Sequence, residues 1–463
     1  MPADNEHDPL DRWLNQQVRP LPPPPGTFEL IKRRARRRKI RRLAITATSA
    51  AVIVAAAVTV PQVVNLPVLN QNPTSAAQAG HSATATPTGP GRTESSATVS
   101  RPSSSSIAAP VPANFRPTSV TFIGTRTGWV IGQASTPGHC ATQYCTSMAR
   151  TDNAGQTWAG VPAPLTGAPD GPTGVSQIRF LNLQDGWAFG PELWVTHNGG
   201  QTWTQVGTHG LRVTDLETVD GRAFALFATC TGAGLAFAAQ CTSFTLYSSL
   251  ASGNDWTPVG AATTGLTDGA ASEAASLVLT GGRGYLLAPD GTLYAGPVDG
   301  SAAWPRAGAL VSSCTVGPAQ LDGQPWQALL GAVNAEELLV ACTSSAGSGS
   351  HTQDKQVFSS LNGGVSWIQI ATAPTTGVAF SLAASPADAV VLGTDRGIDL
   401  LPRGDIAWQM ATLAGGGPAG GFGYVGMTTD VQGVALPADP PAGTVWFTFD
   451  GGQTWKPSHL GGT

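Results

Sequence analysis

The sequence predicts an all-β protein, a seven-bladed β-propeller that follows a single transmembrane helix and a disordered stalk. Three observations support this fold class. A tryptophan-terminated motif recurs along the chain, 57 Gly and 36 Pro among 463 residues supply many turns, and only 12 % of the residues are charged. Long amphipathic helices need many charged residues on the face in contact with water, so an all-helical protein is disfavoured.

The motif has the pattern Ser/Thr, any, Asn/Asp, any, Gly, any, Ser/Thr, Trp. Four segments match it well, and a fifth has Ala251 in place of Asn/Asp. Two further segments, which end at Trp304 and Trp408, keep little beyond the tryptophan. The motif residues of the five better matches are Thr151, Asn153, Gly155 and Trp158; Thr196, Asn198, Gly200 and Trp203; Ser249, Gly253 and Trp256; Ser360, Asn362, Gly364 and Trp367; and Thr448, Asp450, Gly452 and Trp455.

The seven tryptophans follow one another at intervals of 41 to 63 residues. A period of this size fits repeating units of four strands each. One unit shows the expected short strands at residues 175–180, 186–190, 192–196 and 202–206, separated by Gly-rich turns. Seven such sheets over residues 113–463 would close into a ring. The last motif ends at Trp455 and leaves no strand to complete the first blade, so residues 113–116 are an alternative partner for the seventh blade.

Each motif residue has a predicted structural role. The Asn or Asp side chain would accept backbone N–H groups two or three residues further along the chain. The Gly would adopt a positive φ. The Trp would be buried against its own or a neighbouring blade.

These motifs resemble the Asp-box, or bacterial neuraminidase repeat, of sialidase-like propellers, and the resemblance covers residues 113–463. Similar chains include bacterial exported proteins with these repeats and the photosystem-assembly-factor type of propeller. In that family the Asp-boxes are structural turns remote from the catalytic centre. The resemblance therefore implies the fold and leaves the activity open.

A sialidase of this family needs three arginines that clamp the substrate carboxylate, a tyrosine paired with a glutamate, and an aspartate. The family places its first arginine in Phe/Tyr-Arg-Ile-Pro, whereas this chain has Phe115-Arg116-Pro117 without the Ile. No recognisable context surrounds Arg126, Arg150, Arg179, Arg283 and Arg396, or Tyr144, Tyr247, Tyr285, Tyr294 and Tyr424. We therefore predict no catalytic residue and no cofactor.

A metal site is not predicted either. Calcium needs several carboxylates on one loop, but Asn153, Asn198 and Asn362 are amides and only Asp450 is acidic. The histidines His139, His197, His209 and His351 do not have the spacing of metal ligands.

The first 42 residues carry 11 Lys and Arg against 5 Asp and Glu, and a basic run ends at Arg42. Residues 43–60 then contain no charge, Gly or Pro, and we assign residues 43–64 to an uncleaved transmembrane helix. The basic run predicts a cytoplasmic N-terminus and an extracytoplasmic propeller. A cleavable signal peptide is the alternative for the apolar segment, and nucleic-acid binding is the alternative for the basic run. Because the rest of the chain is acidic, we expect no nucleic-acid binding by the main domain.

Residues 8–18 predict a short helix in which Leu10, Trp13, Leu14 and Val18 share one face. This face would dock a cytoplasmic protein or lie on the membrane surface. Residues 65–112 are rich in Ser, Thr, Pro and Ala and predict a disordered stalk.

All six cysteines follow the predicted membrane segment, and an even number in an exported domain predicts three disulfides. Pairing of nearest neighbours gives Cys140–Cys145, Cys230–Cys241 and Cys314–Cys342. The first two pairs would close loops within blades, and the third would link two strands of blade five. A metal site built from these cysteines is the alternative.

The leading hypothesis is a non-catalytic, membrane-anchored propeller that binds an extracytoplasmic protein or glycan. The candidate contact loops are residues 133–147, 231–242 and 343–355, chosen for their insertion length. One alternative is an exo-alpha-sialidase-type glycoside hydrolase. Another is a transmembrane signalling protein with a cytoplasmic regulator bound at residues 1–42.

Overall fold

The computed structural model describes most of the chain from Ala109 onward. The described residues are 109–134, 145–167, 173–231, 240–265, 275–288, 291–310, 314, 327–344, 350–385, 389–439 and 443–461. The predicted membrane segment 43–64, the helix at residues 8–18 and nearly all of the stalk lie outside them. Within the described part of the chain, no helix combines the length and the apolar character needed to span a membrane.

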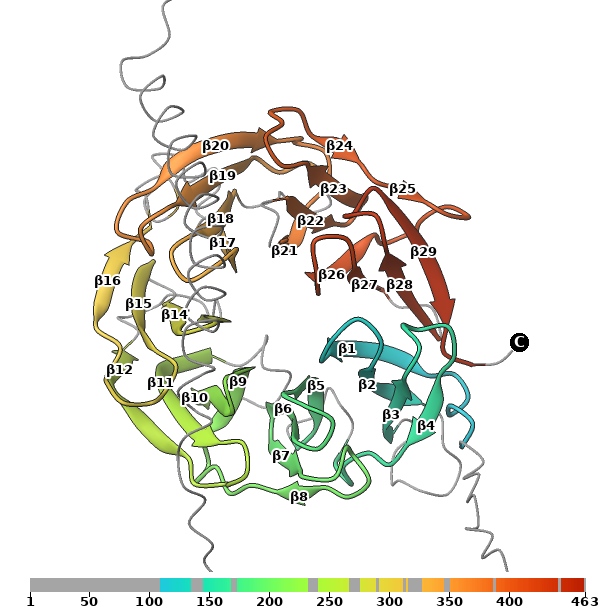
Figure 1. Cartoon of the computed structure of the whole chain (residues 1–463), viewed down its shortest axis with the longest axis vertical. Coiled ribbons are helices and arrows are strands. Elements are labelled where there is room, and N and C mark those ends of the chain that lie inside the picture. The colour runs from blue at the N-terminus through green and yellow to red at the C-terminus, as the bar shows by residue number, and fades with distance from the viewer. Residues whose placement is uncertain are drawn as a thin grey trace, which may run out of the picture. The chain divides into compact units, whose positions relative to one another are not determined.

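Seven β-sheets, each built from consecutive strands, form a ring around a central axis (Figure 1). The all-β seven-bladed propeller that the sequence predicts is confirmed. Blade 1 contains β1 (Arg116–Phe122), β2 (Gly128–Ala134), β3 (Cys145–Thr151) and β4 (Ala159–Val161); blade 2 contains β5 (Val175–Phe180), β6 (Gly186–Pro191), β7 (Leu193–Thr196) and β8 (Thr204–Gln205); blade 3 contains β9 (Arg212–Val219), β10 (Arg222–Thr231), β11 (Gln240–Leu250) and β12 (Thr257–Gly265).

The remaining blades follow the same antiparallel order from the innermost to the outermost strand. Blade 4 contains β13 (Ser276–Thr280), β14 (Arg283–Leu287), β15 (Thr292–Pro297) and β16 (Arg306–Ala309); blade 5 contains β17 (Gln327–Ala332), β18 (Leu338–Thr343), β19 (Lys355–Ser360) and β20 (Ile368–Ala373); blade 6 contains β21 (Ala379–Ala384), β22 (Val390–Thr394), β23 (Gly397–Leu401) and β24 (Gln409–Met410); blade 7 contains β26 (Phe422–Met427), β27 (Gly433–Pro437), β28 (Thr444–Thr448) and β29 (Thr454–His459). A short fifth strand, β25 (Thr412–Leu413), pairs in parallel with the outer edge of β29.

In the part of the chain from Ala109 that the structure describes, the ring closes without an exchanged strand, because the strands of blades 1 and 7 are all consecutive in sequence. The Gly443 N–H of blade 7 donates to the Phe115 carbonyl just before β1, and the Gln432 side chain donates to the Thr125 carbonyl. An apolar cluster that includes Phe115, Phe447 and Leu460 fills the space between the two blades. Side-chain packing and a few hydrogen bonds therefore hold the first and last blades together.

The four well-matched motifs form one hydrogen-bonded turn. The Thr151 hydroxyl accepts the N–H groups of Asn153 and Gly155 at 3.3 and 3.0 Å, and the Asn153 side-chain oxygen accepts the Thr157 N–H at 2.9 Å. The equivalent distances in the other three turns are 2.8 to 3.5 Å. The Asn/Asp oxygen thus accepts the N–H four residues further along in all four turns, because the preceding hydroxyl takes the N–H two residues along.

Glycine is required in these turns for two reasons. The four motif glycines have φ between +78° and +93°, a region that other residues rarely adopt. Two of them also approach the preceding blade too closely for a side chain: a Cβ on Gly155 would collide with Phe447 of blade 7, and one on Gly364 would collide with Leu293 of blade 4. The fifth turn differs, because Ala251 offers no side-chain acceptor and the Gly253 N–H donates to the Leu250 carbonyl instead.

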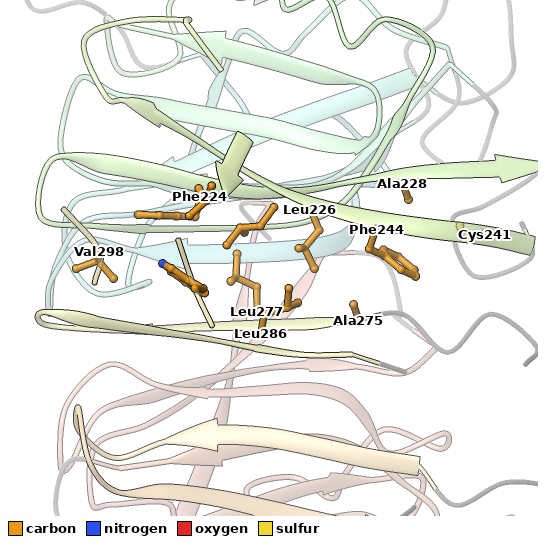
Figure 2. Packing of buried hydrophobic residues seen from close by; sticks show 12 residues of the cluster. Phe224, Leu226, Ala228, Cys241, Phe244, Ala275, Leu277, Leu286 and Val298 are labelled. Atoms are coloured by element: carbon orange, nitrogen blue, oxygen red, sulfur yellow. The ribbon is translucent and has the colours of Figure 1, made fainter. Parts of the chain in front are cut away.

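Each motif tryptophan packs between its own blade and the blade before it. The core divides into seven apolar clusters, one for each pair of adjacent blades, and each cluster contains one of the seven tryptophans. Trp304 of blade 4 lies 5.4 Å from the Phe224 ring of blade 3, measured between ring centroids, and is fully buried. Figure 2 shows this cluster, in which Phe224 and Leu226 of β10 face Leu277 and Leu286 of blade 4.

Two of the predicted disulfides are confirmed. Cys230 and Cys241 are directly opposed on β10 and β11, and Cys314 bonds to Cys342. The prediction that this last disulfide links two strands is wrong, because Cys314 lies in the connection between blades 4 and 5 and only Cys342 is in a strand, β18. It therefore fastens that connection to blade 5. For the remaining predicted pair, Cys140 lies outside the described residues.

Substitution of Gly364 by Ala should destabilise the propeller more than the same substitution of Gly210. Both glycines have positive φ, +87° and +82°, so both variants carry a backbone cost of about 1 kcal/mol. Only a Cβ at position 364 would collide with a neighbour, Leu293, whereas position 210 is open, so Gly364→Ala should lose about 1–3 kcal/mol more. Chemical denaturation of both variants measures the difference, and equal losses would show that the close approach between blades is unimportant.

Candidate ligand-binding site

A cavity of about 490 Å³ lies among the inner strands of blades 7, 1, 2 and 3. These strands, β26, β1, β5 and β9, surround the central axis of the ring (Figure 1). Most of the lining comes from the ends of these strands and the turns that follow. The lining includes the apolar side chains of Phe122, Ile123, Leu181, Met427 and Val434 and the hydroxyl groups of Thr121, Thr218 and Thr428.

The charged part of the cavity is an ion pair. The Arg179 Nε of β5 lies 2.9 Å from the Glu217 Oε1 of β9, and the side chains are 17 % and 28 % exposed. Arg179 also donates from Nη1 to the Ile178 carbonyl at 2.9 Å. Burial acts to lower the pKa of Arg179, but the negative charge of nearby Glu217 outweighs it and raises that pKa above its ordinary value. The guanidinium is therefore a permanent cation whose charge Glu217 balances.

Two further titratable groups adjoin this pair. Burial is the main reason that the pKa of Tyr424, on β26, is raised, so its phenol remains a neutral hydroxyl. Burial, followed by the nearby charge of Glu217, raises the pKa of Asp215 to about 7. The Asp215 Oδ2 accepts the Leu277 N–H of blade 4 at 2.8 Å, and Asp215 does not line the cavity.

The hydrogen bond from the Leu277 N–H to Asp215 is one of several that join the inner strands of adjacent blades. An inner strand has no neighbour toward the axis, so side chains from the preceding blade accept some of its N–H groups. Ser119 of blade 1 accepts from Ile178 of blade 2 at 3.3 Å, and Ser381 of blade 6 accepts from Val425 of blade 7 at 3.2 Å. Asp215 thus has a structural role at the boundary between blades 3 and 4.

The arginines considered in the sequence do not converge on the cavity. Arg179 is the one arginine that lines it. Arg150 pairs with Asp152 at 2.8 Å on the periphery of blade 1, and Arg283 lies over the Tyr285 ring of blade 4. Within the described residues, no group of three or more potential metal ligands occurs.

The sequence did not single out the residues that form this site. Arg179 and Tyr424 lie in no known sequence motif, and no sequence feature marks Glu217 as a site residue. They come from three blades, and neither the motif nor the spacing places them together. The sequence gives one indication of the site. Asp215 and Glu217 are two residues apart, so they place two carboxylates on the same face of a strand. Most of the predicted contact loops 133–147 and 231–242, and part of 343–355, lie outside the described residues.

Comparisons with known proteins find distant similarities to solved structures only. No protein-family model matches the chain, and no curated protein matches it. Among solved structures, YCF48 bound to D1 peptide is similar over 74 % of this chain and 96 % of that chain, with 15 % identity and a TM-score of 0.47. YCF48 from Cyanidioschyzon merolae is similar over 65 % and 89 %, with 16 % identity and a TM-score of 0.42. An ancestral GH74 enzyme is similar over 75 % of this chain and 46 % of that chain, with 11 % identity and a TM-score of 0.48.

Asp215 should make the stability of the propeller depend on pH. Because its pKa is raised from 3.8 to about 7, the folded protein binds more protons than the unfolded chain between these values. Its contribution to the free energy of unfolding is therefore fully present at low pH and falls as the pH rises from about 4 to 7. Asp215→Asn removes this titration and keeps an oxygen that can accept the Leu277 N–H.

Chemical denaturation between pH 4 and 8 measures the effect. The stability of Asp215→Asn relative to the wild type should increase up to about pH 7 and then level off. A constant difference across this range would contradict the assignment.

Proposed function

We propose that this chain is a non-catalytic binding propeller that takes a segment of a protein or glycan ligand into the cavity between blades 7, 1, 2 and 3. The cavity itself carries the proposal. Its volume of about 490 Å³ is in the range of ligand sites, and it combines apolar walls with a few fixed polar groups. The solved propellers in the comparison include both a peptide complex and an enzyme, so they do not favour either function.

The charges of the cavity favour an uncharged ligand segment. Arg179 is balanced by Glu217, and the phenol of Tyr424 is neutral. A ligand with a net charge would have to replace one partner of a partly buried ion pair, which is costly. Hydroxyl or amide groups could instead use the threonine hydroxyls and the guanidinium donors that Glu217 and Ile178 leave free.

The arrangement of carboxylates supports binding without catalysis. Most glycoside hydrolases, sialidases excepted, use two carboxyl groups that flank the substrate, one as acid and the other as base or nucleophile. Here Glu217 is paired with Arg179, while Asp215 is bonded to Leu277 and lies outside the cavity lining. Among the residues that the structure describes, only one carboxylate therefore lines the cavity.

Blocking the cavity should abolish binding. Thr218 lines it, so Thr218→Trp would occupy part of the volume, whereas Thr204→Trp places the same side chain on the exposed outer strand of blade 2. The purified protein is first screened on a peptide array and a glycan array, and the strongest hit is then titrated against both variants. We expect a loss of at least about tenfold in affinity for Thr218→Trp alone. Equal affinity of both variants, or no hit on either array, would refute the proposal.

A sialidase-type hydrolase is the second candidate. The observation that favours it is the gathering of Tyr424, Glu217 and Arg179 at one cavity, with a carboxyl of raised pKa, Asp215, beside them. Its test is turnover of a fluorogenic sialoside by the purified protein. Turnover that Arg179→Ala and Tyr424→Phe both abolish would establish the hydrolase and refute a purely binding function.

The proposed protein is held at the membrane by a transmembrane helix at residues 43–64. Its support is the basic run before residues 43–60 and the absence of charge within that segment. The proposed topology places residues 1–42 in the cytoplasm, where the Trp13 face would contact a partner, and the propeller outside. Retention of the full chain in membranes after an alkaline wash tests the anchor. Pull-down with residues 1–42 and with Trp13→Ala tests the cytoplasmic contact.

A further inference from the structure

The outer rim of blade 5 exposes an apolar surface, formed by Leu361 and Val365 of the motif turn and Ile368 and Ile370 of β20. Their exposures are 42 %, 67 %, 50 % and 40 %. The chain carries no Asp, Glu, Lys or Arg between Lys355 and Asp388. Met410 in β24, the outer strand of blade 6, and Ile406 just before this strand are also exposed. Figure 1 shows β24 next to β20 on the rim.

The other repeats of the same chain provide an internal comparison for the turn. The position of Val365 is occupied by glutamine in the three other well-matched motifs, Gln156, Gln201 and Gln453. A polar residue is therefore compatible with the turn, and the valine is not needed to build it.

The same comparison applies to the strand. The position of Ile368, directly after the motif tryptophan, holds Ala159, Thr204 or Lys456 in those repeats. Blade 5 alone among the four has a large apolar residue at both positions. Exposed apolar surface that the fold does not require indicates a contact with another molecule.

Outer strands of this propeller already pair with further backbone at two places, with a strand in blade 7 and with a single bridge in blade 1. In blade 7, Thr412 and Ala414 donate to the carbonyls of Gln453 and Trp455 at 2.8 and 2.9 Å. In blade 1, the Gly160 N–H donates to the Ala109 carbonyl at 2.8 Å. By register, Val365 and Trp367 correspond to the two acceptors and Gln369 corresponds to the donor.

The outer edge of β20 has the properties of a strand-pairing site. β20 is the last strand of its sheet, and within the described residues no further strand pairs with it. Its six residues, Ile-Gln-Ile-Ala-Thr-Ala, include no Pro and no charge, two features that protect an edge, and one bulge at Ile370 interrupts its pairing with β19. The longer outer strand β12 contains Pro258, and β8 and β24 have only two residues each.

We propose that β20 pairs antiparallel with β20 of a second copy of this chain and joins two propellers rim to rim. An antiparallel pair of identical edges is self-complementary, since a two-fold axis places each donor opposite the matching acceptor. The lack of charge removes the repulsion that usually opposes identical strands, and the apolar side chains of blade 5 meet their own copies. The cavity on the inner strands stays free, so the pairing is independent of the proposed binding function.

Variants copied from the other blades test this pairing. Val365→Gln with Ile368→Lys gives blade 5 the residues of blade 7, and Gln369→Pro removes an N–H at the position where blade 7 has Pro457. Thr204→Lys, at the position of Ile368 in blade 2, is the matched control. The full chain is purified in detergent, and its mass is measured by sedimentation over a range of concentrations. Thermal unfolding checks that each variant is folded.

We expect a wild-type dimer, a dissociation constant at least about tenfold weaker for the double variant, and no change for Thr204→Lys. A wild-type monomer at the highest concentration would overturn the proposal. A double variant as dimeric as the wild type would overturn it as well, because the dimer would then form elsewhere, for instance through the predicted membrane helix. If Gln369→Pro does not fold, the double variant still decides the matter.

Discussion

The fold depends on the contact that each motif turn makes with the preceding blade. The tryptophan places its ring between the two sheets, while the turn glycine brings the backbone close to the neighbour, as Gly155 does against Phe447. A single blade cannot bury both faces of its sheet, so each is stable only with its neighbours. The hydroxyl and amide bonds within the turn fix the tryptophan at the correct angle for this contact. The motif is therefore an inter-blade joint as well as a local turn.

The same dependence between neighbours explains the candidate site. Inner strands have an unpaired edge, and Ser119, Asp215 and Ser381 provide acceptors to the next blade where it needs them. Asp215 therefore links blades 3 and 4 and also lies near Glu217, and its pKa is raised first by burial and then by the charge of Glu217. Arg179 compensates that negative charge and leaves a cavity whose charges are balanced. The balanced charges of the cavity therefore follow from how the ring is held together.

The sequence specified the repeat through local chemistry. Positive-φ glycines, hydroxyl acceptors and tryptophans at regular intervals identify turns and strands without knowledge of any distant residue, and the pairs Cys230–Cys241 and Cys314–Cys342 followed from proximity along the chain. Details that depend on a competing group were less accurate. The Asn/Asp oxygen accepts the N–H four residues along because the Ser/Thr hydroxyl takes the N–H two residues along, and Cys314 lies in a connection rather than in a strand.

By itself, therefore, the sequence determined the all-β class, the number of blades and the composition of each turn, because these depend on residues within one repeat. Only the tertiary structure decided which blade each tryptophan packs against, how the ring closes at Phe115 and Gly443, and that Arg179, Glu217 and Tyr424 meet at one cavity. Those three residues are separated by up to about half of the chain. Their encounter is set by the curvature of the ring, which arises from the packing of all seven blades together and is not encoded in any one of them.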